Sequence, residues 1–350
     1  MPTFSIDDIQ QFSIDLLAAG GTSAEEAEVV GRSLIGANLR GYDSHGVMRI
    51  PFYIDMINRG DTCSDVELTV ITETPTSIVA DANWGLGRVQ CGRLLDGLIQ
   101  KAKQHGIAMG TLKQASHIGR LGEYCEMAAE EGLLSLMMAN THGASRRVAP
   151  PGGIAPRLGT NPLAIGVPHG DKPIILDFST SATAEGKVRV KKIAGDECPE
   201  GWLLDSAGRP TTDPEKLYTD PPGTILPMGG EQAYKGFGLA LMVDIFAGAL
   251  SGGLCARETP ITPKGNCLFL VLIDPAHAGG TESYGIEVDQ LIEFVRSCPT
   301  ADGVNGITLP GDPERQALER IEAAGLFIDE ENWQQLTALA ETLGVSIPAE

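Results

Sequence analysis

A histidine and an arginine near residue 45 stand at a spacing that suits proton transfer beside a carboxylate. Ser44 and His45 open the segment SHGVMRIPFY, and Arg49 and Tyr53 follow four and eight residues after the histidine. On a helix, residues four apart share one face, so His45, Arg49 and Tyr53 would lie together. A histidine exchanges a proton near neutral pH, and an arginine fork binds a carboxylate through two hydrogen bonds. The pattern therefore suits an enzyme of 2-hydroxy or 2-oxo acids, and it equally fits an amphipathic helix with a surface salt bridge.

A second candidate, His117, stands in a small-residue turn, ASHIGR, directly before an expected helix. The N–H groups at a helix start bind anions, so this turn also suits a substrate or cofactor. The histidines at 105, 169 and 277 lie in glycine- or proline-bearing segments typical of surface turns, and position 142 is ambiguous. The residues alone leave both His45 and His117 as candidates for the proton-transfer group.

The sequence does not indicate a common glycine-rich nucleotide loop. Its best match to GxGxxG is GLGRVQCG at 85–92, in which the third glycine is displaced. No acidic residue on a following strand completes a Rossmann fingerprint, and a Walker A motif is absent. Residues 85–92 are predicted to start a helix, so any dinucleotide site must use another fold.

The elements that position these residues follow a helical, then mixed, then helical pattern. Capping patterns at Ser5 and Ser23 predict two helices before residue 41. A hairpin is predicted over 67–80 and a helix over 94–105. From residue 106 short apolar runs predict buried strands between glycine-bearing helices, namely IAMGTL, LLSLMMAN, PLAIGVP, PIILDF and CLFLVLID. Further helical patterns are predicted at about 286–297, 312–324 and 331–343.

We therefore predict an α/β fold in three parts. Residues 1–105 form an N-terminal helical part that carries the DSHG turn, residues 106–285 a central α/β part, and residues 286–350 a set of C-terminal helices. No internal repeat or long linker divides the chain into independent units.

Charge and cysteine usage exclude several partner classes. Lys and Arg number 26 and Asp and Glu 46, which gives a net charge of −20. Such an acidic chain suits neither nucleic acid nor an anionic membrane surface. Seven widely spaced cysteines without a CxxC predict reduced thiols, and no signal peptide is visible. We expect a cytoplasmic protein without nucleic-acid or membrane partners.

Seven blocks, in order over about residues 4–340, make the chain similar to a known family. They are DSHGVMR (43–49), SHIGRLGEY (116–124), GTNPLAIGVP (159–168), LDFSTSATAEGK (176–187), GWLLDSAGRPTTDP (201–214), YKGFGLALMVDI (234–245) and LPGDPE (309–314). The chain resembles the type 2 malate/L-lactate dehydrogenase family, which includes sulfolactate, ureidoglycolate and broad-range hydroxycarboxylate dehydrogenases and imine reductases. The HIGR and PEGW…PTTDP stretches look most like the broad-range hydroxycarboxylate dehydrogenases.

The resemblance implies an NAD(P)-dependent oxidoreductase, usually a homodimer with its active site between lobes. It implies a non-Rossmann cofactor-binding sheet domain, flanked by a helical lobe formed from both termini, with residues 286–350 packing back on the N-terminal part. By match to the family motif, His45 is the acid/base, Ser44 its neighbour, Arg49 the substrate-carboxylate ligand and Thr160 a pocket residue. In ureidoglycolate-type members the proton acceptor is the histidine that matches His117. The cofactor contacts implied are His117, Ile118, Gly119, Arg120, Leu121, Asp177, Phe178, Ser179, Tyr234, Lys235, Pro310, Gly311 and Arg315, and no metal site is expected.

Two positions depart from the family pattern. Lys187 stands at a catalytic position where the imine reductases carry an aspartate relay residue, which favours hydroxy acid chemistry over imine reduction. Tyr234 stands where the usual HKGYG block has histidine, while Lys235 aligns with the family lysine.

We predict reversible hydride transfer between NAD(P) and a small 2-hydroxycarboxylate that resembles malate, lactate or sulfolactate, with His45 accepting the hydroxyl proton. NAD is expected because Asp177 suits the ribose hydroxyls and no basic residue follows it before Lys187. Arg120 and Arg315 keep NADP as the other choice. The alternatives are an NADPH-dependent reductase of cyclic imino acids, a metal-dependent hydrolase or aldolase using His45, His117 and Asp177, and an inactive binding protein.

Overall fold

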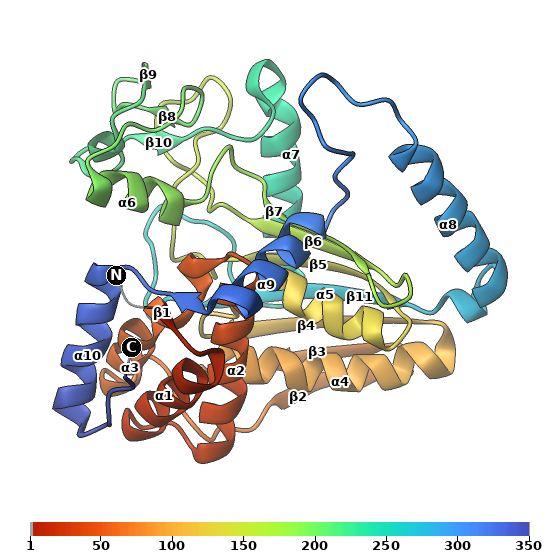
Figure 1. Cartoon of the computed structure of the whole chain (residues 1–350), viewed down its shortest axis with the longest axis horizontal. Coiled ribbons are helices and arrows are strands. Elements are labelled where there is room, and N and C mark those ends of the chain that lie inside the picture. Colours follow the sequence, from red (N-terminus) through yellow and green to blue (C-terminus); the bar gives the residue numbers. More distant parts are fainter. Residues whose placement is uncertain (1–2, 350) are drawn as a thin grey trace.

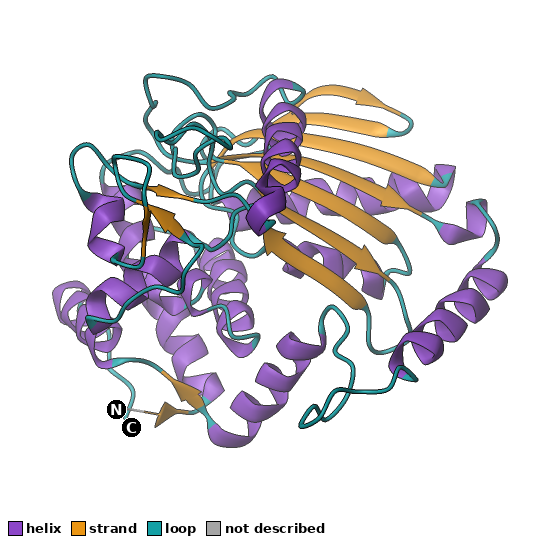
Figure 2. Cartoon of the chain, turned by 90° about the horizontal axis from the view of Figure 1, so that it is seen from above, coloured by secondary structure: helices purple, strands orange, loops and turns teal. Residues whose placement is uncertain are grey.

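A seven-stranded mixed sheet organises the chain, as seen in the computed structural model, which describes residues 3–349. Figures 1 and 2 show the sheet, whose order is β2-β3-β4-β11-β5-β6-β7. Its strands are β2 (Thr69–Thr74), β3 (Ser77–Asp81), β4 (Ile107–Ala115), β5 (Leu134–Asn140), β6 (Pro162–Val167), β7 (Ile174–Ser179) and β11 (Asn266–Ile273). Strands β3 and β4 pair in parallel, and the other neighbours pair antiparallel. The predicted hairpin, the five predicted strands and the α/β class are confirmed. Strand β7 is only partly buried, because Leu176 is exposed and Ile175 is its one buried residue.

Helices cover both faces of this sheet. On one face lie α4 (Gly87–His105) and α5 (Leu121–Glu130), and the other face carries α7 (Ala233–Asp244), which continues as a π-helix over Ile245–Ala249 (Figure 2). Leu94 and Leu98, one turn apart on α4, are fully buried against β4. A Cβ on Gly110 of β4 would lie 2.4 Å from a methyl of Leu98, so glycine lets the helix approach closely. Helix α4 begins at Gly87, within the glycine-rich segment predicted to be a helix start.

Helices from both ends of the chain share a second core. Its helices are α1 (Ile6–Ala19), α2 (Ala24–Leu39), α3 (Ile50–Asn58) and α10 (Glu330–Leu343), joined by the β1 (Thr3–Phe4) and β12 (Leu326–Phe327) pair (Figure 1). The predicted caps form, since Ser5 and Ser23 accept hydrogen bonds from the backbone three residues on. Trp333 of α10 packs on Phe4, with ring centroids 4.3 Å apart.

Two more C-terminal helices complete the predicted set. Helix α9 (Asp312–Ala324) lies against α2, whereas α8 (Thr281–Arg296) stands away from the sheet at the right of Figure 1. Within the first 105 residues, β2, β3 and α4 belong to the main sheet layer. The division of the chain at residues 105 and 285 stays a prediction. No helix within residues 3–349 is both long and apolar enough to cross a membrane.

A small unit with its own core lies next to the helices that share the second core (Figure 1). It contains α6 (Glu185–Ala194) and a three-stranded sheet of β8 (Leu203–Leu204), β9 (Pro210–Thr211) and β10 (Thr224–Ile225). Val148, Val188 and Ile225 are fully buried at its centre. The sequence did not predict this unit. We call it the small β unit below.

Candidate active site

The turn that carries His45 is held in shape by Asn38 of α2. It consists of two short 3₁₀ helices, 43–45 and 47–49, on either side of Gly46, whose backbone is extended (φ −89°, ψ −155°). The Asn38 amide donates to Asp43 Oδ1 at 2.8 Å, and its oxygen accepts from the Val47 N–H at 2.9 Å. A Cβ on Gly46 would lie 2.0 Å from Asn38 Oδ1, so the turn requires glycine. Because the helix is interrupted here, the prediction that His45 and Arg49 share one helical face is wrong.

The two residues nevertheless line one cavity of about 360 Å³. Of the residues predicted from the sequence, this cavity brings together Ser44, His45, Arg49, His117, Ile118, Gly119, Leu121 and Thr160. Arg49 Nε donates to the Ser44 carbonyl at 2.6 Å, which fixes the guanidinium. Its two terminal nitrogens have no hydrogen-bond or ion-pair partner among residues 3–349. They are therefore available to bind a carboxylate.

The two candidate histidines lie next to each other at this cavity. Their ring centroids are 5.5 Å apart and the planes are tilted by 27°. Ser44 Oγ lies 3.0 Å from His45 Nδ1, and the Tyr53 hydroxyl lies 2.7 Å from His117 Nδ1. Burial, with the positive charges of Arg49, Arg88 and Arg120, lowers the pKa of His45 to about 3. Burial, with Arg49, His45 and Arg88, also lowers the pKa of His117, so both rings are neutral at pH 7.

Arg88 contacts the backbone of His45 directly and reaches His117 through Tyr53. Nothing in the sequence pattern marks Arg88 as a residue of the site. Its side chain is only 1 % exposed. Its Nη2 donates to the His45 carbonyl at 2.6 Å, and its Nε donates to the Tyr53 hydroxyl at 3.2 Å. Its third nitrogen contacts Ser33 Oγ and lies 3.7 Å from Glu123 Oε2.

The glycines around Arg88 explain how α4 reaches this position. A Cβ on Gly87 would lie 2.2 Å from the Ser116 carbonyl oxygen, and a Cβ on Gly119 (φ +80°) would lie 2.7 Å from the guanidinium carbon of Arg88. The start of α4 therefore packs directly on the loop that carries His117. The GLGR segment serves this close packing.

The small β unit supplies another wall of the cavity, which the sequence did not identify. Arg147 precedes its first core residue, Glu185 opens α6, and both line the cavity together with Lys264. Glu185 accepts a hydrogen bond from the Tyr218 hydroxyl at 3.0 Å and lies 3.9 Å from Arg147 Nη2. This wall therefore places both signs of charge beside Arg49.

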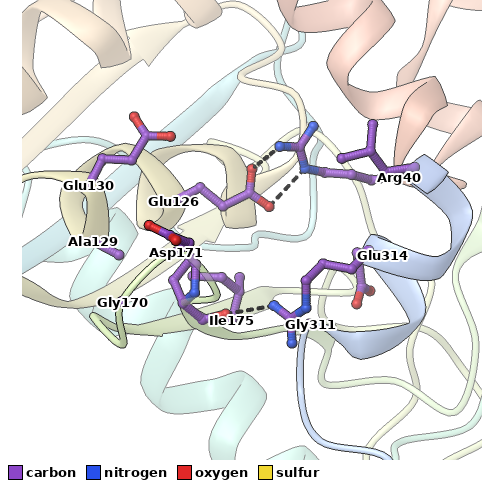
Figure 3. Close-up of a pocket in the computed structure, with 12 residues that line it drawn as sticks. Arg40, Glu126, Ala129, Glu130, Gly170, Asp171, Ile175, Gly311 and Glu314 are labelled. Carbon is purple, nitrogen blue, oxygen red and sulfur yellow. Dashed lines mark hydrogen bonds and ion pairs between the residues drawn. The ribbon is translucent and has the colours of Figure 1, made fainter. Parts of the chain in front are cut away.

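A second cavity of about 380 Å³ lies between α5, β7 and the start of α9 (Figure 3). Gly311 and Arg315, both predicted from the sequence, line it together with Arg40, Glu126 and Glu314. Arg40 forms an ion pair with Glu126 at 2.8 Å, as Figure 3 shows. Acidic groups predominate in the lining, which also includes Glu130 and Asp171.

Arg120 and Asp177 contact or adjoin residues that line the two cavities. Arg120 is buried, precedes Leu121 of the first cavity and pairs with Glu126 of the second at 2.8 Å. Asp177 accepts a hydrogen bond from the Gly122 N–H at 2.7 Å, and burial raises its pKa to about 6. Nε and Nη1 of Arg120 are buried without a partner among the described residues. An anionic ligand group beside Arg120 would suit these unsatisfied donors.

Known proteins resemble this chain along nearly its whole length. Residues 4–337 match the family described as malate/L-lactate dehydrogenase. The chain belongs to this family. It is 35 % identical to malate dehydrogenase of Pyrococcus horikoshii, covering 97 % of this chain and 95 % of the relative. It is 34 % identical to L-lactate dehydrogenase of Cupriavidus necator, covering 98 % and 99 %. The solved structure of a putative malate/lactate dehydrogenase from E. coli superposes with a TM-score of 0.92 at 32 % identity, covering 99 % and 96 %.

The resemblance to the malate/L-lactate dehydrogenase family is thus confirmed, while the roles of individual residues stay predictions. Tyr53 is buried and contacts His117, and Lys187 is exposed on the first turn of α6. Tyr234 and Lys235 are exposed at the start of α7. The other expected cofactor contacts are the half-buried Phe178 and Ser179 and the exposed Pro310. Within residues 3–349 no group of three or more His, Cys, Asp or Glu side chains is arranged to hold a metal ion.

Proposed function

We propose that this dehydrogenase transfers a hydride reversibly between NAD(P) and a small 2-hydroxycarboxylate or 2-oxocarboxylate. The observation that carries the proposal is the free end of Arg49 in one cavity with two neutral histidines, His45 and His117. Arg49 binds the substrate carboxylate, and one of the histidines exchanges a proton with the C2 oxygen. The bound nicotinamide supplies or accepts the hydride, while the protein contributes orientation and charge.

We propose that the second cavity and its link to the first hold the dinucleotide. We expect Gly311, Arg315, Asp177 and the unsatisfied nitrogens of Arg120 to lie beside it. A Rossmann site uses a parallel sheet and a glycine loop, whereas this sheet is largely antiparallel. These features support a non-Rossmann cofactor domain, flanked by a helical lobe built from both termini.

The lining of the second cavity favours NAD over NADP. Its two arginines are already paired, Arg40 with Glu126 and Arg315 with Asp312 at 2.7 Å. The carboxylates around them suit ribose hydroxyls and would repel a 2′-phosphate. We therefore propose NAD as the cofactor.

A panel of 2-oxo acids, followed at the absorbance of NADH and NADPH, tests the proposed function. We expect turnover of small 2-oxo acids, with or without a second anionic group, and faster turnover with NADH. Piperideine-2-carboxylate belongs in the same panel, because its reduction with NADPH in preference to every oxo acid would establish the imine reductase alternative. Absence of turnover with all compounds, together with NADH binding, would contradict both hypotheses.

We also propose a cytoplasmic homodimer. All seven cysteines are free thiols, as is usual in a reducing compartment. The outer face of α7 and its π-helix exposes a run of large apolar side chains: Leu241, Met242, Ile245, Phe246 and Leu250. A contiguous exposed apolar surface of this kind is typical of a subunit interface, so we propose that a second copy covers it.

A further inference from the structure

We propose that Arg88, acting through Tyr53, fixes His117 in the neutral tautomer that carries its proton on Nε2. In this tautomer His117 presents a donor to the cavity and protonates the C2 oxygen when a 2-oxo acid is reduced. Arg88 is then a positioning residue, and His117 the catalytic one. The tautomer follows from the described contacts alone, while the identity of the proton acceptor rests on the proposed function.

The hydrogen bonds of the Tyr53 hydroxyl determine this tautomer. The hydroxyl oxygen accepts a hydrogen bond from Arg88 Nε at 3.2 Å, and an arginine N–H is always a donor. The hydroxyl has one hydrogen of its own, and the side chain is 4 % exposed. His117 Nδ1, at 2.7 Å, is the one acceptor for that hydrogen among residues 3–349. Nδ1 must therefore be unprotonated, and a neutral ring then carries its hydrogen on Nε2.

The surroundings of His117 keep the ring neutral. Besides Tyr53 of α3, three groups face it from neighbouring elements, namely Arg49 and His45 from the 43–49 turn and Arg88 from α4. The two arginines oppose a positive ring. Burial acts in the same direction. Glu123 and Tyr124 of α5 favour the charged Arg88 guanidinium.

His45 has no comparable constraint. Its Nδ1 contacts Ser44 Oγ at 3.0 Å, and a hydroxyl can either donate to that nitrogen or accept from it. Both tautomers of His45 are compatible with this contact. The contacts of His117 therefore determine which ring nitrogen carries its proton, whereas those of the adjacent His45 do not.

The arrangement permits a balanced proton relay during reduction. As hydride arrives at C2, the Nε2 proton of His117 moves to the C2 oxygen, and the Tyr53 proton moves to Nδ1. The ring stays neutral, Tyr53 becomes a phenolate beside the Arg88 guanidinium, and a proton from solvent later restores the phenol. Oxidation runs the same steps in reverse and begins with ionised Tyr53.

Nitrogen NMR of protein labelled with ¹⁵N-histidine reads the tautomer directly at pH 7, without turnover. The His117 signals are assigned as those lost in His117→Gln. We expect the wild type to have the proton on Nε2 of His117, and Tyr53→Phe to shift population towards Nδ1–H because the donor to Nδ1 is gone. A wild-type His117 with its proton on Nδ1, or on both nitrogens, overturns the proposal.

Kinetics test the role of Arg88 against a matched control on the same helix. Arg93 also donates to a backbone carbonyl, that of Val66 at 2.8 Å, and Arg93→Met should leave kcat unchanged. Arg88→Met and Tyr53→Phe should each lower kcat for oxo acid reduction on the order of 10²-fold, with less change in KM. In the nitrogen NMR spectrum of Arg88→Met, the His117 population should also shift towards Nδ1–H, because the Tyr53 hydroxyl oxygen has lost the donor that occupies it and can accept from Nδ1. A folded Arg88→Met that keeps the wild-type His117 tautomer and the wild-type kcat overturns the proposal, and Tyr53→Phe decides the case if Arg88→Met does not fold. Absence of all oxo acid turnover would instead overturn the proposed function.

Discussion

Replacement of Arg49 by methionine tests whether this residue binds the substrate carboxylate. Its terminal nitrogens are free to form two charge-assisted hydrogen bonds, each contributing about 1.5–3 kcal/mol. Arg147 and Lys264 line the same cavity and retain some positive charge, so we take the lower end of the sum, about 3 kcal/mol. At 1.36 kcal/mol per factor of ten, this corresponds to a loss of roughly 150-fold in kcat/KM.

The assay compares a good 2-oxo acid with its primary amide in both proteins. The wild type should prefer the acid by roughly the same factor of 150, and Arg49→Met should turn over acid and amide at similar, low rates. Binding of NADH and the melting temperature serve as controls, because Arg49 Nε also holds the Ser44 carbonyl. Arg59→Met, which removes a surface arginine paired with Asp55, is the matched variant and should keep the wild-type preference. If Arg49→Met still prefers the acid by more than about 30-fold, the carboxylate binds elsewhere.

Three further predictions concern stability, cofactor and assembly. The pKa of His45 is lowered to about 3, so its contribution to the free energy of unfolding is present above pH 6.5 and is lost as pH falls towards 3, by about 1.4 kcal/mol per pH unit. Denaturant titrations should therefore show a shallower acid loss for His45→Gln than for wild type, and equal slopes would refute this. With one good oxo acid, kcat/KM should be higher for NADH than for NADPH, and a tenfold advantage for NADPH, about 1.4 kcal/mol, would show that the acidic cavity does not select the cofactor. The double variant Met242→Glu/Phe246→Glu places charges on the proposed interface and should be monomeric by light scattering. The control Val190→Glu, at an exposed position of α6, should stay dimeric. A dimeric double variant would place the interface elsewhere.

Five strands of the main sheet could be predicted because they are apolar runs next to glycine or proline, and the β2–β3 hairpin could be predicted from its alternating pattern around Pro75. The small β unit could not, since its strands have two residues each and α6 buries one side chain, Val188, among charged neighbours. No periodicity can be read from such elements. They are stabilised by a core whose side chains come from segments far apart in the sequence, from Val148 to Ile225.

The residues of the site also differ in whether the sequence could identify them. His45, Arg49 and His117 could be selected by residue type, because histidine and arginine in glycine-bearing turns suggest proton transfer and anion binding from the sequence alone. Arg88 could not, since an arginine at a helix start is usually exposed, and its partner Tyr53 lies 35 residues away. The helical spacing of 45 and 49 also misled, because the Asn38 amide and Gly46 interrupt the helix between them.

The proposed substrate cavity is lined by groups from separate cores of the chain. The small β unit carries Arg147 and Glu185, while the histidines, Tyr53 and Arg88 belong to the elements of the other two cores. Under the proposed function, substitutions in 144–147 and 184–186 change the wall of the cavity and leave the two histidines, Tyr53 and Arg88 in place. A directed-evolution library for new 2-hydroxy acids is best confined to those two segments.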